Sequence, residues 1–245
     1  MRLSANTGYL FTDLPFPDRI RAAANAGFDA VEFHDEVQSG DADTITAALA
    51  ATGLPVLSLN VRMGPGFGCA ALPGREATAL GDFRDALAAA EAVDARAIHV
   101  MAGTGEGSAS VFAANLARFA DLTDRTVLVE PISQARVPGY VLSRVDDAAR
   151  LLDTARRPNL GILMDVYHVL AEGDDPADLI ARHGDRIAHV QIASFPSRGA
   201  PGGEGPDYRA LIPALQAARL DALGCEYHPG STAPDAAALR QAIGL

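Results

Sequence analysis

Four oxygen-bearing side chains each follow an apolar run in the second half of the chain. They are, in chain order, Glu130, Asp165, Gln191 and Glu226. If the four runs are neighbouring parallel strands, their carboxyl ends meet at one edge and these side chains converge there. Three clustered carboxylates repel one another, and burying each of them is costly unless its charge is compensated. A divalent cation is the simplest compensation, and an all-oxygen ligand set favours Mg²⁺ or Mn²⁺ over zinc or copper.

Arginine is the alternative source of positive charge for these carboxylates. All 20 basic residues of the chain are arginines, and Arg144, Arg186 or Arg198 could pair with the acidic side chains. The absence of lysine excludes Schiff-base chemistry, pyridoxal phosphate attachment and a lysine general base. Any acid–base chemistry therefore has to use carboxylates, histidines or tyrosines.

Two histidines lie close in sequence to these oxygen-bearing residues. His168 follows Asp165 by three residues, at the start of the next loop or helix, and we expect it to lie near the cation. His189 has the same strand parity as Gln191, so its side chain is expected to point into the barrel. A single histidine inside a barrel is more often a satisfied core residue than a catalyst, and we interpret His189 in that way.

Short apolar runs alternate with longer amphipathic, alanine-rich stretches along the whole chain. Eight runs are typical of buried strands: 3–6, 30–33, 55–60, 97–101, 126–130, 161–165, 187–192 and 222–226. Helical patterns follow them near 17–26, 42–52, 74–93, 110–122, 143–156, 175–183, 207–218 and 235–242. Near-continuous apolar strands indicate burial on both faces, as in a parallel sheet covered by helices. The pattern predicts one α/β domain, a closed (β/α)8 TIM barrel over residues 1–245, with Ser110 and Ser143 as helix N-caps.

Two connections are longer than a minimal turn. Residues 62–72 follow the third predicted strand, and residues 195–206 follow the seventh; both are rich in glycine. Loops that follow barrel strands line the mouth at the carboxyl end, where active sites are built. We therefore expect both segments to act as lids over the site.

Composition restricts the classes of partner. The net charge is −11 with no basic cluster, which argues against a nucleic acid or an anionic membrane. No apolar run resembles a signal peptide or reaches the roughly 18 residues of a membrane span. The two cysteines, Cys69 and Cys225, suggest no disulfide framework. We expect a cytoplasmic enzyme with a small-molecule substrate, and association into a homo-oligomer is an open alternative.

Several segments of the sequence resemble the hydroxypyruvate isomerase family, within the xylose-isomerase-like barrels. The most specific are Asp165-Val166-Tyr167-His168, His189-Val190-Gln191-Ile192-Ala193 and Gly224-Cys225-Glu226-Tyr227, and the resemblance runs nearly end to end. It implies a metal ion held by Glu130, Asp165, Gln191 and Glu226. It also implies that the two glutamates act as the acid–base pair.

Differences from the family pattern lie where substrate length would be sensed. Ser194 stands three residues after Gln191, where the family usually has an aspartate, and Glu204-Gly205 reverses the usual order. Related sugar epimerases usually carry a histidine in place of Gln191, so the glutamine favours the isomerase branch. These differences bear on the identity of the substrate more than on the type of reaction.

The function expected from the sequence is aldose–ketose isomerisation of a small hydroxy-oxo acid. Hydroxypyruvate would become tartronate semialdehyde, or a 2-oxo-tetronate would react, by proton transfer between Glu130 and Glu226 through a cis-enediolate. His168 would bind a substrate oxygen, and Arg198 would either grip the substrate carboxylate or solvate its own loop. The alternatives are a sugar 3-epimerase or dehydratase of the same superfamily, and a non-catalytic metal-binding barrel.

Overall fold

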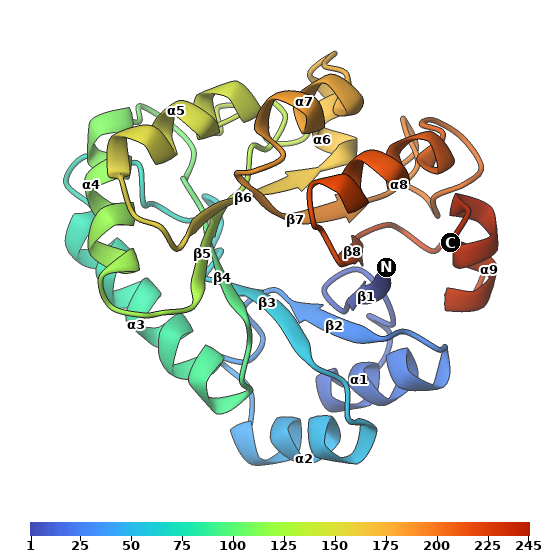
Figure 1. The fold of residues 1–245 in the computed structure, drawn as a ribbon. Helices are drawn as coiled ribbons and strands as arrows, with labels where there is room; N and C mark the ends of the chain where they lie inside the picture. Colours follow the sequence, from blue (N-terminus) through green and yellow to red (C-terminus); the bar gives the residue numbers. More distant parts are fainter.

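The strands form a closed barrel in which each strand pairs in parallel with its neighbours in chain order (Figure 1). The computed structural model describes residues Met1–Leu245. Its strands are β1 (Arg2–Asn6), β2 (Ala30–Phe33), β3 (Val56–Asn60), β4 (Ala97–Val100), β5 (Thr126–Val129), β6 (Leu160–Asp165), β7 (Ile187–Ile192) and β8 (Ala222–Cys225). The predicted (β/α)8 barrel is confirmed.

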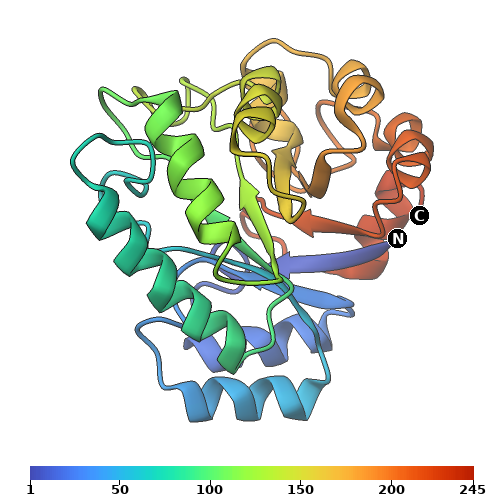
Figure 2. The same ribbon diagram turned by 60° about the vertical axis from the view of Figure 1, so that its left-hand side comes forward.

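Helices surround the barrel and cover the outer faces of the strands (Figures 1 and 2). They are α1 (Phe16–Asn25), α2 (Ala42–Thr52), α3 (Glu76–Ala92), α4 (Ala109–Ala120), α5 (Val145–Ala155), α6 (Val166–Ala171), α7 (Pro176–His183), α8 (Tyr208–Ala217) and α9 (Ala236–Ile243). The short helix α6 is an addition to the eight helices expected from the sequence. None of these helices has the length and hydropathy needed to cross a membrane.

Strand burial explains the apolar runs of the sequence. Almost every strand residue is buried, because one face of each strand packs on the helices and the other fills the barrel. Pairing sets the strand ends level with one another: Asn6 is opposite Glu32, and Asp165 is opposite Gln191. Polar residues at the carboxyl ends of different strands are therefore brought to one edge. Both cysteines are buried and free.

Helix N-caps differ in part from the sequence prediction. Ser108 caps α4 by accepting a hydrogen bond from the backbone N–H of Val111, so the prediction of Ser110 was wrong. Arg144 occupies the N-cap of α5 without a side-chain bond, so Ser143 was also wrong. At α6 the cap is Asp165, whose Oδ1 accepts from the backbone N–H of Tyr167 at 2.9 Å. The metal-ligand candidate thus also fixes the start of a helix.

We predict that Gly161→Ala destabilises the barrel by about 1–3 kcal/mol, the usual cost of overpacking. A Cβ at Gly161, in β6, would lie 2.5 Å from the Cβ of Ala188 on β7, and both atoms are fixed by the backbone. Gly81→Ala is the matched control, because a Cβ there meets nothing and alanine favours the helix α3 by up to about 1 kcal/mol. Denaturant unfolding measures both, and equal stability of the two variants would contradict the prediction.

Candidate functional site

The four oxygen-bearing residues predicted as ligands all lie buried at the carboxyl edge of the barrel. Glu130 directly follows β5, Asp165 ends β6, Gln191 lies within β7, and Glu226 directly follows β8. Glu130, Gln191 and Glu226 line a pocket of about 440 Å³, counted with its opening to solvent, together with Asn60 from β3 and His99 from β4. Asp165 does not line this pocket, but it is bound to Arg198, which does. Met63 and Phe67 line it from the connection after β3, and Arg198 from the connection after β7, so both long loops stand at the mouth as expected.

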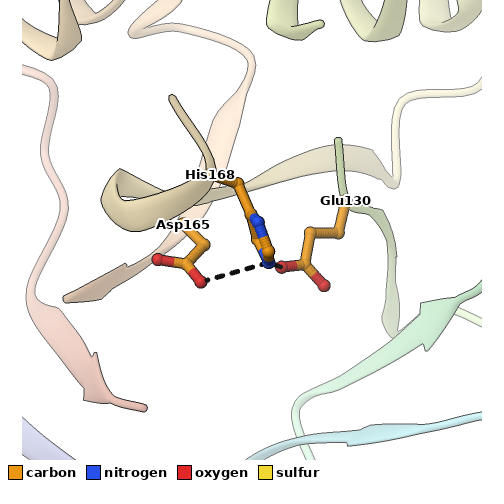
Figure 3. Close-up of side chains that lie close together, drawn as sticks. All are labelled: Glu130, Asp165 and His168. Carbon is orange, nitrogen blue, oxygen red and sulfur yellow. Dashed lines mark ion pairs between the residues drawn. The ribbon is translucent and has the colours of Figure 1, made fainter. Parts of the chain in front are cut away.

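His168 lies between two of the carboxylates (Figure 3). Its Nε2 is 3.6 Å from Asp165 Oδ2 and 3.8 Å from Glu130 Oε1. One possible ligand atom from each of these three residues lies within 4.8 Å of the other two, a spacing that could hold a metal ion. Burial lowers the pKa of His168 to about 4, so the ring is neutral at neutral pH.

The hydrogen bonds of His168 indicate a donor rather than a metal ligand. The backbone N–H of Ser133 points at His168 Nδ1 at 3.3 Å, and the Ser133 hydroxyl lies 3.0 Å from the same nitrogen. A backbone N–H can only donate, which makes Nδ1 the acceptor and assigns the ring proton to Nε2. The Nε2–H group therefore faces the pocket, where it can bind a substrate oxygen.

Arg198 supplies the positive charge inside the site. Its Nη2 donates to Asp165 Oδ2 at 2.9 Å and to Glu226 Oε1 at 2.7 Å, and only 4% of the residue is exposed. The guanidinium lies over the rings of Tyr9 and Tyr167, with its carbon 4.9 and 4.7 Å from the ring centroids. The alternative that Arg198 solvates its loop is wrong, because the side chain is buried and paired.

The other two arginines considered as partners lie outside the site. Arg144 pairs with Glu172 and Asp174, and Arg186 pairs with Asp153, all on the surface. Arginine pairing is therefore realised for Asp165 and Glu226 through Arg198. No arginine pairs with Glu130.

Glu130 carries the least compensated charge of the cluster. Its nearest basic neighbour besides His168 is His99, whose Nε2 lies 3.6 Å from Glu130 Oε2. Burial lowers the pKa of His99 to about 3, so this ring is neutral as well. Burial, followed by the negative charges of Glu226 and Asp165, raises the pKa of Glu130 well above its usual value. Burial also raises the pKa of Glu226, although Arg198 opposes this shift.

A fourth buried carboxylate, that of Glu32 on β2, lies next to this cluster and was assigned no role from the sequence. Glu32 Oε2 lies 2.6 Å from His189 Nε2, and Glu32 Oε1 accepts from Gln191 Nε2 at 3.0 Å. Gly224 leaves the space for this carboxylate, since a Cβ there would collide with it. His189 is thus a satisfied core residue, as predicted. Asn6, also without an assigned role, donates to Glu226 Oε2 at 2.7 Å.

Gln191 provides the test of whether a metal ion fits this site. Because its amide nitrogen is bound by Glu32, its Oε1 is buried without any hydrogen-bond partner. A buried acceptor without a partner is rare, and next to three carboxylates it is suited to a hard cation. The oxygen chemistry of the predicted set, Glu130, Asp165, Gln191 and Glu226, therefore suits a hard cation, while the donor atoms found within 4.8 Å of one another are those of Glu130, Asp165 and His168. Such an ion and Arg198 would compete for the oxygens of Asp165 and Glu226.

Comparison with known proteins relates the chain to one group of barrels. The family model described as xylose isomerase-like TIM barrel matches residues 20–245. A 2-oxo-tetronate isomerase from Cupriavidus necator is 35% identical over 245 residues, 93% of each chain, and a hydroxypyruvate isomerase from Escherichia coli is 31% identical over 95% of each chain. The crystal structure of an AP endonuclease of family 2 from Brucella melitensis has a TM-score of 0.90 at 34% identity, covering 94% of both chains.

We predict that Glu32→Gln lowers the free energy of unfolding by about 1–3 kcal/mol. The glutamine amide group would bring a donor against either His189 or the Gln191 amide, where the native carboxylate accepts from both. Glu91→Gln makes the same chemical change at an exposed position of α3 and should be neutral. Urea denaturation of the two variants tests this, and an unchanged midpoint for Glu32→Gln would show that the network contributes nothing.

Proposed function

Because the chain belongs to the xylose isomerase-like TIM-barrel family, and within it to the hydroxypyruvate isomerases, we propose that it is a metal-dependent isomerase of small hydroxy-oxo acids. The proposed reaction converts hydroxypyruvate to tartronate semialdehyde, or isomerises a 2-oxo-tetronate. Relatives carry both names, 2-oxo-tetronate isomerase and hydroxypyruvate isomerase, at similar identity.

One observation carries the proposal: the buried carboxylates of Glu130 and Glu226 line the same pocket as Gln191, whose amide oxygen has no hydrogen-bond partner. The third buried carboxylate, Asp165, lies 3.6 Å from the Nε2 of His168 in the pocket wall. The guanidinium of Arg198 is the single buried cation that compensates their negative charge. The donor set is all oxygen, which is the set that Mg²⁺ and Mn²⁺ prefer. When bound, such an ion would act as a Lewis acid that lowers the cost of negative charge on adjacent substrate oxygens.

Glu130 and Glu226 are the proposed acid–base pair, and the two carboxyl groups have different contacts. Glu130 has the neutral rings of His99 and His168 within 4 Å and no arginine partner, and burial raises its pKa above the usual range, which suits a carboxyl group that takes up and releases a proton. Glu226 is fixed by Asn6 and Arg198 on its two oxygens. One glutamate removes a proton from a carbon bearing oxygen, and the other delivers a proton to the neighbouring carbon.

The proton balance of the reaction follows from the substrate. A proton leaves the hydroxymethyl carbon of hydroxypyruvate and a proton arrives at the former carbonyl carbon, while the hydroxyl proton passes to the neighbouring oxygen. Both oxygens lie on the same side of the planar cis-enediolate between these two steps. His168 donates its Nε2–H to one of them, and Arg198 contacts substrate oxygens from the side of Asp165 and Glu226.

Substrate screening with purified protein and added Mg²⁺ or Mn²⁺ tests the proposed reaction. Hydroxypyruvate and 2-oxo-tetronate should be isomerised, whereas free ketohexoses, the substrates of a 3-epimerase, should not. Turnover in D₂O should introduce deuterium at the carbon that receives the proton. A protein that binds the sugar acid without exchanging deuterium would be a binding barrel, and the isomerase proposal would be rejected.

We predict that Glu130→Gln and Glu226→Gln each lower kcat on the true substrate by on the order of 10²–10⁴-fold or more, because glutamine cannot transfer the proton. Circular dichroism should show an unchanged fold. Glu91→Gln makes the same change at an exposed glutamate of α3, outside the pocket, and should keep its activity. Near-wild-type turnover by either pocket variant would refute the acid–base assignment.

We predict that Asp165→Ala, and Asp165→Asn, which keeps an oxygen to cap α6, bind Mn²⁺ about tenfold or more weakly than the wild type. Both changes remove one ligand charge from the site. Elemental analysis after dialysis against Mn²⁺ measures the bound metal without any assay of activity. Asp13→Ala removes an exposed, unpaired carboxylate and serves as control. Full metal content in both Asp165 variants would exclude this residue as a ligand.

A further inference from the structure

The pocket is lined by two arginines, and only one of them forms salt bridges. Arg198 is buried and bound to Asp165 and Glu226. Arg136 also lines the pocket, from the connection between β5 and α5, but it is exposed and forms no salt bridge. Arg136 is therefore a cation that lines the pocket beside Tyr9 and has no carboxylate partner.

The loop that carries Arg136 is held in place by internal hydrogen bonds. The Ser133 carbonyl accepts from the backbone N–H groups of Arg136 and Val137, each at 3.0 Å. The Gln134 side chain donates to the Tyr140 carbonyl at 2.7 Å and accepts from the Gly139 N–H at 2.8 Å. Because Ser133 is also the partner of His168, the backbone of Arg136 is tied to the donor that faces the substrate.

An acid substrate meets an electrostatic difficulty in this pocket. The inner wall is formed by Glu130 and Glu226, with Asp165 behind them, so a carboxylate that entered alone would be repelled. A metal ion offsets charge at the reacting carbons, whereas the carboxylate of a sugar acid lies beyond them. A neutral sugar does not have this difficulty. The pocket therefore needs a separate cation for the far end of an acid substrate.

We propose that Arg136 binds the carboxylate of the substrate and thereby selects sugar acids over neutral sugars of the same length. This inference rests on the proposed function and adds a specificity residue to it. Arginine presents two parallel N–H groups to a carboxylate, a stronger and more directional contact than a lysine ammonium offers. Arg198, which is buried beside Asp165 and Glu226, is assigned to the substrate oxygens nearest the reacting carbons.

Two substrates that differ only at the far end test the assignment. Hydroxypyruvate carries a carboxylate where dihydroxyacetone carries a hydroxymethyl group. Arg136→Met should lower kcat/KM for hydroxypyruvate by about 10- to 100-fold, chiefly through a higher KM. The kcat/KM for dihydroxyacetone should not change. Arg136→Lys should recover part of the loss. Arg75→Met removes another exposed arginine without a salt bridge, outside the pocket, and should match the wild type.

Binding of tartronate, a dicarboxylate with no carbon pair to isomerise, separates failure of this inference from failure of the proposed function. Calorimetry with Mg²⁺ present should give weaker binding to Arg136→Met than to the wild type or Arg75→Met. Equal affinities, or equal losses of kcat/KM on both substrates, overturn the role of Arg136. If the wild type turns over neither hydroxypyruvate nor 2-oxo-tetronate, the proposed function fails, and the tartronate comparison still decides whether Arg136 binds a carboxylate.

Discussion

The structure depends on how buried negative charge is compensated at one end of the barrel. Glu32, Glu130, Asp165 and Glu226 are all at most 8% exposed, and Arg198 is the one buried guanidinium among them. The charge of these carboxylates is compensated in different ways. Glu32 accepts two side-chain hydrogen bonds, and Asp165 and Glu226 both pair with Arg198. Glu130 is left with neutral rings. That imbalance is costly in an inert core, and it is the condition under which a carboxyl group can exchange protons or attract a cation.

The two halves of the chain contribute different groups to the site, and closure of the barrel brings them together. The last four strands contribute the proposed ligands, while the first four contribute the groups that hold them, such as Asn6, Glu32 and the pair His99 and Asn60. Because β1 pairs with β8, residues more than 200 positions apart become neighbours. The orientation of Gln191 shows the result: a carboxylate from β2 fixes which end of the amide faces the pocket.

The strands, the closed barrel and the gathering of Glu130, Asp165, Gln191 and Glu226 were predictable, because they follow from local hydrophobic patterns and from the level ends of parallel strands. The role of Glu32 was not, since a glutamate inside an apolar run gives no indication of which distant donors it meets. Arg198 adopts a left-handed backbone conformation, φ 55°, that turns it inward from a glycine-rich loop. No periodicity predicts such a turn. The N-caps failed for a similar reason: Ser108 and Ser110 are both suitable, and only the path of the backbone decides between them.

The two tyrosines whose rings contact Arg198 give this protein an intrinsic optical probe. The chain has no tryptophan and only five tyrosines, so two of its five main ultraviolet chromophores lie against the guanidinium at the centre of the pocket. Departure of that guanidinium from Tyr9 and Tyr167 would change the polarity and quenching around both rings. Rearrangement of the buried charges can therefore be followed by intrinsic tyrosine emission in the unlabelled protein, as a change in two of its five tyrosines.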